Sequence, residues 1–307
     1  MHAPGETAVV GLGQASYDSL GLLASFPAED EKVELAAIEG QCGGPASTAL
    51  VTLSRLGIRT SFLGAVGDDP AGREIVKGLD AEGVESGFLK IRPGHTSQSA
   101  FIAITRKSGK RTIFWHRGSA PPLCREEVDL SSFPNAQILH LDGLMLGASL
   151  EAARQARARG MRVIMDAGTL RDGSLDLLPL VDTLIASERF AEPLVGRETP
   201  PEKALKELSR FSPGELVITL GARGSVGLKG TTLIRQEAVS VAAVDTTGAG
   251  DVYHGAYIYG ALEGWSMDEC MRFASAVSAM KCLEVGARKG IPTLEEVLSF
   301  QSKTTAR

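Results

Sequence analysis

The segment 245–251 combines residue types that suit phosphate chemistry. It reads Asp-Thr-Thr-Gly-Ala-Gly-Asp and lies where a helix of small and apolar residues is expected to begin. Small residues at a helix start leave the backbone N–H groups of the first turn open to an anion, and the helix dipole adds to the attraction. A carboxylate directly behind such an anion site would repel phosphate unless it acts as a base. Asp251 is therefore predicted to take a proton from an alcohol, while Gly248, Ala249 and Gly250 stabilise a transferring phosphoryl group.

Strands and helices in alternation must position this segment. Apolar residues predict an opening strand at 8–13 and a helix at 46–56, which Gly57 would end. A glycine-rich stretch runs from 221 to 230. Strands that alternate with amphipathic helices predict a mostly parallel sheet with helices on both faces. The other expected strands lie at 61–66, 137–141, 162–166, 183–186 and 216–220, and the other helices at 71–82, 150–159, 202–211, 248–264 and 267–284.

Two stretches, 14–41 and 95–118, break this pattern. They alternate between apolar and polar residues and contain no helical stripe. The second is typical of a hairpin, with strands at 98–105 and 111–115 joined through 107–110. We expect the two stretches to meet as one small β-sheet that covers the strand ends of the large domain as a lid.

The domain plan that follows is discontinuous. The large α/β domain comprises 1–13, 42–94 and 119–307, and the lid comprises 14–41 and 95–118. A small sheet with apolar residues on both faces cannot bury both of them against its own domain. We therefore expect a homodimer in which two lids pair across a two-fold axis.

Composition excludes several classes of protein. With 32 Lys and Arg against 37 Asp and Glu, the chain carries a formal charge of −5, which argues against a nucleic-acid binder. Its four cysteines, at 42, 124, 270 and 282, show no C-x-x-C spacing, so neither a disulfide framework nor a zinc site is expected. We find no signal peptide and no apolar run long enough to span a membrane. The sequence thus predicts a cytoplasmic protein.

Two signatures resemble those of the ribokinase-like, or PfkB, family of sugar and nucleoside kinases. The C-terminal one is the segment 245–251 with the small-residue helix that follows it. The N-terminal one begins at Gly43-Gly44-Pro45-Ala46-Ser47-Thr48 and continues through Arg55-Leu56-Gly57 to Gly64-x-x-Gly67-Asp68-Asp69-x-x-Gly72. The resemblance covers essentially the whole chain and implies a ribokinase-like α/β fold with a small β lid.

The resemblance also implies an ATP-dependent kinase that uses magnesium. Asp251 matches the family's general base toward the acceptor hydroxyl, and Gly248, Ala249 and Gly250 match its anion hole. Phosphoryl transfer requires mainly positioning and charge neutralisation, which a backbone nest, one base and a magnesium ion on the nucleotide can supply. The residues that match the nucleotide site are Ser187, Thr219, Gly221, Gly224, Ser278 and Cys282.

A monovalent cation site beside the anion hole is implied as well. Asp245 and Thr247 match positions that contribute to such a site in many members, and the loop around Gly286 would complete it. Potassium would be its occupant. A helix-capping role explains Asp245 equally well.

For the acceptor, the resemblance points to a carboxylate after the first strand. Asp18 is the matching residue, and a carboxylate suits the recognition of vicinal hydroxyl groups. Gly43 and Gly44 would let the backbone approach a sugar closely. Further candidates for contact with the acceptor are Thr48, Gln98 and Arg117.

The chain also departs from the family pattern. Thr48 stands where the family usually has Asn. The family's Asn-x-x-Glu motif, which helps to order magnesium, is reduced here to 187–190, and Glu188 or Glu192 can stand in only if the turn differs. The Asp-x-Asn-x-Arg pattern is reduced to 166–170, with Arg171 one position late. These changes concern substrate choice and metal handling more than the reaction type.

Rival functions differ in class. Gly11-x-Gly13 lacks the third glycine of a dinucleotide-binding fingerprint, and no helix pattern follows it. A sugar sensor without turnover is an alternative that the reduced 187–190 motif favours and Asp251 opposes. Within the kinase reading, 108–115 and 272–276 resemble the branch of ketohexokinases and the sulfofructose kinase, which implies a ketose-like acceptor with a primary hydroxyl. Ribose, 2-keto-3-deoxygluconate and nucleosides remain open as acceptors.

Overall fold

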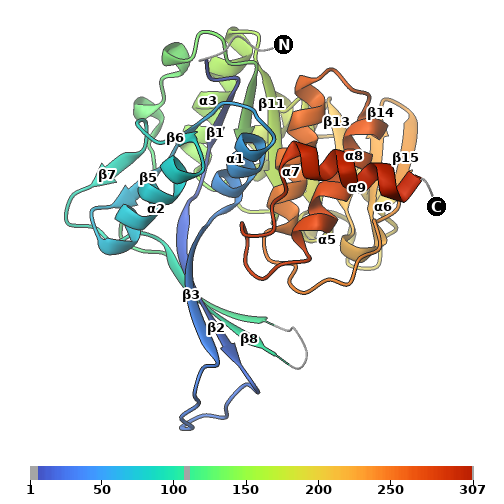
Figure 1. Ribbon diagram of the computed structural model, residues 1–307. Coiled ribbons are helices and arrows are strands. Elements are labelled where there is room, and N and C mark those ends of the chain that lie inside the picture. Colours follow the sequence, from blue (N-terminus) through green and yellow to red (C-terminus); the bar gives the residue numbers. More distant parts are fainter. Residues whose placement is uncertain (1–5, 107–110, 306–307) are drawn as a thin grey trace.

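The computed structural model describes residues 6–106 and 111–305 and contains two main sheets (Figure 1). The predicted α/β class is confirmed, because a large and mostly parallel sheet carries helices on both faces. Across the sheet, the strands lie in the order β15 (Thr232–Gln236), β14 (Ser225–Lys229), β13 (Glu215–Thr219), β12 (Thr183–Ser187), β11 (Arg162–Ala167), β10 (Ile138–Leu141), β1 (Val9–Leu12), β4 (Thr60–Leu63) and β6 (Val84–Glu85).

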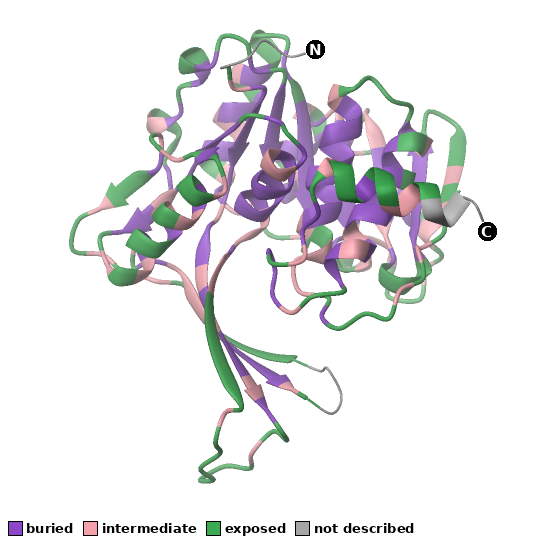
Figure 2. Ribbon diagram, in the orientation of Figure 1, coloured by how far each residue is buried: buried purple, intermediate pink, exposed green. Residues whose placement is uncertain are grey.

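Apolar side chains cover both faces of this sheet, and most of its strands are coloured as buried in Figure 2. Neighbouring residues of a strand point to opposite faces. Thus Ile138 packs in the layer of α1, α2, α7 and α8, whereas Leu139 packs in the layer of α3, α5 and α6. The helices are α1 (Pro45–Arg55), α2 (Pro70–Ala81), α3 (Leu146–Ala158), α4 (Ser174–Leu177), α5 (Glu188–Val195), α6 (Pro201–Leu208), α7 (Ala249–Leu262), α8 (Met267–Lys281) and α9 (Leu294–Thr305).

Four strands form a separate sheet, here called the small sheet, which projects from the large body (Figure 1). Its order is β3 (Ala37–Gly43), β2 (Ser16–Leu23), β8 (Ser99–Thr105) and β9 (Arg111–His116). β2 runs parallel to β8 and antiparallel to β3, and β8 and β9 pair antiparallel, as expected for a hairpin. The predicted turn at 107–110 lies outside the described residues. A further pair joins β5 (Ala65–Gly67) to β7 (Lys90–Arg92).

The glycine-rich stretch 221–230, for which no element was predicted, contains β14. β14 and β15 extend the central sheet in antiparallel fashion beyond β13. Position 227 lies within β14 and is occupied by glycine, because a side chain there would collide with Met267 and Met271 of α8. This glycine therefore serves helix packing against the sheet and does not mark a turn. The sequence analysis also missed α5, which contains Pro193, and α9.

No helix of the part described is long and apolar enough to cross a membrane.

Candidate active site

Four parallel strands end at the same edge of the central sheet and line one cavity there. Asp142 follows β10, Asp166 lies at the end of β11, Ser187 ends β12 and Thr219 ends β13. The cavity measures about 280 Å³ and is completed by Gly250, among other residues of α7. Crevices at the carboxyl ends of parallel strands are the usual ligand sites of open α/β sheets.

The N-terminus of α7 closes this cavity, and no side chain caps it. By contrast, Asp69 caps α2 and Ser266 caps α8. Gly248 takes a left-handed φ of 75° at the start of α7, where a Cβ would lie 2.9 Å from the carbonyl oxygen of Ala287. An uncapped helix start beside a cavity leaves N–H dipoles for an anionic ligand.

Asp251, in the first turn of α7, is half-buried in the cavity wall. Burial, together with the charge of Asp166, raises the pKa of Asp251 to about 7. Asp142, only 6% exposed, has its pKa raised to about 6, also mainly by burial. The carboxyl groups therefore hold protons more tightly than free Asp does, and Asp251 has the affinity of a proton acceptor that works near neutral pH.

His254, one turn further along α7, connects this turn to the sheet. Its Nδ1 lies 2.6 Å from the carbonyl oxygen of Gly250, and its Nε2 lies 3.2 Å from that of Ile185. The same Nε2 is 3.5 Å from Oδ1 of Asp166. The ring thereby fixes the orientation of the peptide between Gly250 and Asp251. These contacts make His254 a residue that supports the site from behind.

A second cavity of about 430 Å³ lies on the other side of the same helix start. Its walls are largely apolar, with Ala238, Val241 and Ala279 among them. The two cavities share Thr219 and Gly250. A ligand with a flat apolar end and an anionic end can thus lie in the second cavity and reach the N-terminus of α7.

Most residues matched to the nucleotide site gather in this second cavity. Its lining includes Thr219, Gly221, Gly224, Ser278 and Cys282. Ser278 Oγ donates to the carbonyl oxygen of Ala249, which ties α8 to the start of α7. Ser187 lines the first cavity instead, where its hydroxyl donates to the carbonyl oxygen of Gly168.

Asp245 has internal partners for both carboxylate oxygens. Oδ1 accepts hydrogen bonds from the N–H and hydroxyl of Thr247, and Oδ2 accepts one from the N–H of Gly286. Although burial raises the pKa of Asp245, these bonds outweigh it and hold the pKa below its ordinary value. The buried ammonium of Lys281 donates to the carbonyl oxygen of Asp245. The carboxylate of Asp245 thus already accepts three hydrogen bonds within the protein. A potassium ion at Asp245, Thr247 and Gly286 stays a prediction from the resemblance.

None of the residues matched to acceptor binding lines the first cavity. Asp18 is only 9% exposed, and burial raises its pKa. A Cβ at Gly43 would lie 2.5 Å from Oδ2 of Asp18, so only glycine fits there. The hydroxyl of the fully buried Thr48 has no hydrogen-bond partner among the described residues. Gly44 starts α1 with a φ of 101°.

Two candidates on the small sheet occupy different surroundings. Gln98 is half-buried, and its carbonyl oxygen accepts a hydrogen bond from the N–H of Tyr17. Arg117 is exposed and lies over the ring of Trp115, 5.2 Å from its centroid. Arg111, at the start of β9, reaches the large domain and donates to Thr246 Oγ1 at 3.0 Å.

The described residues contain no group of three His, Cys, Asp or Glu side chains arranged to hold a metal ion. The carboxylates that could stand in for the reduced 187–190 motif form ion pairs, Glu188 with Arg223 and Glu192 with Arg197. Of the carboxylates that line the first cavity, Asp251 lies in the first turn of α7 and Asp166 lies 3.5 Å from His254 of the same helix. Magnesium, which neutralises charge on a nucleotide's phosphates, would therefore meet these two.

The sequence analysis did not mark two buried polar residues, Asp142 in the first cavity and Arg288 near Gly43. Asp142 accepts hydrogen bonds from the N–H groups of Gln14 and Leu144. Its position directly after a predicted parallel strand was the signal that could have identified it. Arg288 is buried behind Gly43, and no pattern in the sequence marked it.

Comparisons with known proteins agree with this geometry. Residues 6–294 match the pfkB family carbohydrate kinase profile. The chain belongs to the pfkB family of carbohydrate kinases. A Haemophilus influenzae protein named ribokinase is 32% identical over 84% of this chain and 86% of its own length.

Solved structures support the same conclusion. One from Agrobacterium tumefaciens is 29% identical and superposes with a TM-score of 0.89 over 99% of this chain and all of that chain. Arabidopsis thaliana ribokinase, complexed with ribose and ATP, is 25% identical and has a TM-score of 0.82 over 96% of this chain and 98% of that chain. The fold of this pfkB kinase is thus ribokinase-like, and the chain is a phosphotransferase of that family.

Proposed function

We propose that this pfkB kinase transfers the γ-phosphoryl group of ATP to a hydroxyl, preferably primary, of a small ketose-like carbohydrate. The observation that carries the proposal is the junction of the two cavities at Thr219 and Gly250, at the uncapped start of α7. The apolar cavity that would take the adenine lies on one side of the uncapped helix N-terminus. The cavity that contains the carboxylate of Asp251 lies on the other side. The ketose-like acceptor rests on the sequence resemblance of 108–115 and 272–276.

In this mechanism the adenine occupies the second cavity, between 238–243 and α8. The phosphates extend to the start of α7, where the backbone of Gly248, Ala249 and Gly250 stabilises the charge that develops during transfer. Magnesium on the nucleotide neutralises further charge. The protein does not need to form a covalent bond with the phosphoryl group, since phosphoryl transfer depends mainly on position and electrostatics.

Asp251 removes the proton of the acceptor hydroxyl. Its raised pKa places its proton affinity near the working pH, where a general base is most efficient. His254 holds the turn that carries Asp251, and Asp166 adds the negative charge that raises its pKa. Asp251 therefore both orients the acceptor hydroxyl and accepts its proton.

The small sheet would serve as a lid over the acceptor. Asp18 on β2 and Gly43 at the end of β3 face each other in this sheet, and Thr48 lies in α1 just behind them. We expect Asp18, Gly43, Gly44, Thr48 and Gln98 to contact the acceptor when the lid closes. Closure excludes water from the phosphoryl group and so limits hydrolysis of ATP.

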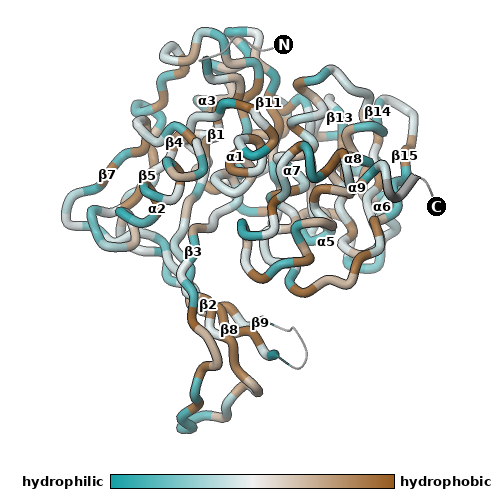
Figure 3. The backbone as a smooth tube through the Cα atoms, in the orientation of Figure 1, coloured by the Kyte–Doolittle hydropathy of each residue, from teal (hydrophilic) through white to brown (hydrophobic). Residues whose placement is uncertain are grey.

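The assembly and location that we propose follow from surface chemistry. The small sheet exposes Ile38, Phe114 and Trp115, which are 64%, 53% and 55% accessible. Figure 3 shows hydrophobic stretches along β2, β8 and β9. These residues support a homodimer through the small sheet. All four cysteines are free thiols, which suits the reducing cytoplasm.

The test is a substrate panel. Purified protein is assayed for ADP release with ATP, magnesium and one of a series of ketoses, aldoses, sugar acids or nucleosides. We expect a signal that depends on a carbohydrate and disappears in Asp251→Asn. As a matched control, Asp176→Asn replaces an acidic residue of α4, away from the lining of both cavities, and should retain activity. A signal that survives in Asp251→Asn would refute the assignment of the base.

A further inference from the structure

A third cavity, here called the edge cavity, lies between the free edge of β3, the end of α2 and the loop 285–289. It measures about 290 Å³ and shares no lining residue with the two cavities of the active site. Its polar lining residues are Glu39, Gln41, Arg55, Glu82, Arg288 and Lys289. Such a volume suits a small ligand of a few polar groups.

Arg288 is the unusual member of this lining. Its side chain is only 6% exposed, yet it forms no ion pair with any described carboxylate. Nη2 donates to Ser47 Oγ at 2.9 Å and, more weakly, to the carbonyl oxygen of Gly43 at 3.4 Å, whereas Nε has no hydrogen-bond partner in the part described. A buried cation with unpartnered donors is costly unless a ligand supplies the missing acceptors.

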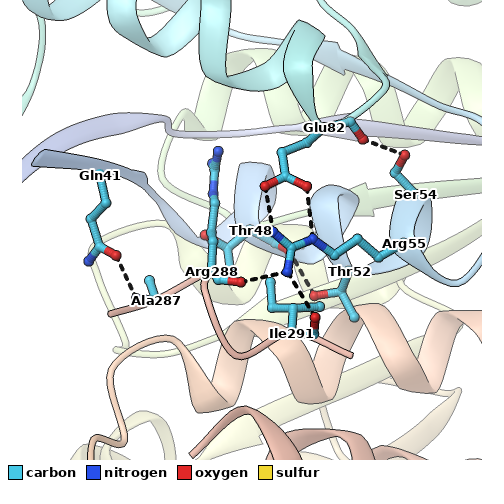
Figure 4. A network of polar contacts seen from close by, with 9 residues as sticks. All are labelled: Gln41, Thr48, Thr52, Ser54, Arg55, Glu82, Ala287, Arg288 and Ile291. Atoms are coloured by element: carbon cyan, nitrogen blue, oxygen red, sulfur yellow. Dashed lines mark hydrogen bonds and ion pairs between the residues drawn. The ribbon is translucent and has the colours of Figure 1, made fainter. Parts of the chain in front are cut away.

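Gln41 adds a second unpartnered donor to the same wall (Figure 4). Its Oε1 accepts a hydrogen bond from the N–H of Ala287, which fixes the side chain, but its buried Nε2 has no partner among the described residues. Two donors on one wall, one of them cationic, call for an acceptor that carries negative charge.

The remaining charges of the lining do not supply that acceptor. Arg55 and Glu82 form a two-point ion pair, with Nε and Nη2 of Arg55 at 2.8 and 2.6 Å from the carboxylate oxygens. This pair is therefore neutral as a unit. Lys289 and Glu39 are both exposed and offset each other at the mouth. Arg288 forms no ion pair with any of them, and its charge interacts with Asp18, Glu82 and Asp251 only at longer range.

We propose that the edge cavity binds a small molecule with a phosphate or carboxylate group, held by Arg288 and Gln41. The anion completes the hydrogen bonds of both side chains and neutralises the guanidinium. The edge cavity shares no lining residue with either active-site cavity, so its ligand is a third molecule in addition to the substrates of the proposed reaction.

The position of the cavity gives its ligand a way to influence the active site. Gln41 belongs to β3 of the small sheet, and its partner Ala287 packs against Gly248 at the start of α7. The neighbouring Gly286 donates to Asp245, which precedes the anion-binding turn. A ligand on Gln41 and Arg288 therefore fixes the small sheet relative to the loop that supports α7.

The test measures binding, so its outcome is independent of whether the chain phosphorylates a sugar. Isothermal calorimetry and thermal shifts are recorded with inorganic phosphate and with malonate, on protein saturated with magnesium and a non-hydrolysable ATP analogue so that the start of α7 is occupied. We expect saturable binding of at least one of the two anions, with a rise in Tm that grows with concentration. The tighter of the two identifies the phosphate or carboxylate class.

Variants locate the site. We expect Arg288→Met and Gln41→Leu each to weaken anion binding at least tenfold, and Arg171→Met, which alters the lining of the active-site cavity, to leave it unchanged. If Arg288→Met does not fold, Gln41→Leu carries the test alone, because it removes an unpartnered donor and one loop contact. Absence of saturable binding in the wild-type protein would overturn the proposal. So would unchanged binding in Gln41→Leu, or loss of binding in Arg171→Met.

Discussion

At the scale of single residues, the ionised side chain of Asp251 lowers the free energy of unfolding of the protein. Burial and the charge of Asp166 raise its pKa, so the folded protein binds this proton more tightly than the unfolded chain does. The group therefore opposes folding as the pH rises from the ordinary pKa of Asp through about 7, and at neutral pH its full contribution is destabilising. Such a cost is typical of a residue retained for chemistry.

Asp251→Asn is expected to abolish turnover while raising thermal stability. The amide cannot accept the proton, a loss of about a hundredfold to ten-thousandfold in rate for a general base. The same change removes a carboxylate whose ionised form the fold disfavours, so Tm at pH 8 should rise. Thermal unfolding at pH 8 and at pH 4 measures the second effect, which should shrink at the lower pH. A fall in Tm at pH 8 would contradict the electrostatic argument.

The pH dependence of the reaction reports on the same cluster. The groups that influence Asp251 are Asp142, Asp166, His254 and Arg288, and the first two raise its pKa while the last two lower it. The rate kcat/KM should rise with pH and level off above about 7, as Asp251 loses its proton.

Replacement of His254 by Asn should move that limb of the profile to higher pH, because a neutral side chain no longer lowers the pKa of Asp251. The amide of Asn can still donate to a backbone carbonyl oxygen, so the turn should keep its shape. An unshifted limb together with a general loss of kcat would mean that His254 acts through structure alone.

At the scale of secondary structure, the start of α7 contains two glycines that serve different purposes. Gly248 has a left-handed φ, and a Cβ there would crowd Ala287. Gly250 has no atom within 4 Å of the place where a Cβ would stand, but it lines both active-site cavities. The first glycine is required by the backbone, and the second by the ligand.

Exchanging each glycine for alanine should separate the two roles. Gly248→Ala should cost about 1–2 kcal/mol from its left-handed backbone, in addition to the crowding. Gly250→Ala should leave stability unchanged or improve it by up to about 1 kcal/mol, since alanine is the better helix former. Its methyl group would nevertheless occupy the junction of the cavities, so KM for ATP should rise. Equal losses of stability in both variants would disprove this division.

The elements of the sheet show how far sequence alone could predict the fold. The alternation of apolar strands and amphipathic helices indicated most of the central sheet correctly, since each strand from β10 to β13 is buried on both faces. The alternation did not predict β14. Gly227 is required there by contacts with methionines 40 and more positions away, and no local sequence pattern indicates such contacts. In the same way, Asp251 follows from a local motif, whereas Asp142 and Arg288 become functional candidates only through distant neighbours.

At the scale of the whole molecule, the small sheet is poorly covered by the rest of the chain. Its strands form an open sheet whose edge strands are β3 and β9, and every residue of β9 is exposed. Phe114 of β9 lies 6.3 Å from Phe26 and 6.4 Å from Phe101 between ring centroids, which makes a connected aromatic surface. Exposed strands and aromatic surfaces of this kind favour association with another chain.

The protein is therefore expected to be a dimer by light scattering or analytical ultracentrifugation at micromolar concentration. Phe114→Glu should shift it toward monomer, because the charge would have to be desolvated at the interface. Leu298→Glu, which replaces a residue of α9 that is 55% exposed, is the matched control and should leave the dimer intact. A wild-type monomer, or a Phe114→Glu dimer as stable as the wild type, would exclude the small sheet as the interface.

The two active-site cavities have only Thr219 and Gly250 in common. Every other lining residue belongs to one cavity or to the other. Substitutions that reshape the cavity of Asp142 and Asp251 can therefore accumulate without a change in the walls of the cavity proposed for adenine. In evolution or in engineering, such a kinase can exchange its acceptor while it retains its phosphoryl donor. The junction at the start of α7 must be preserved in either case.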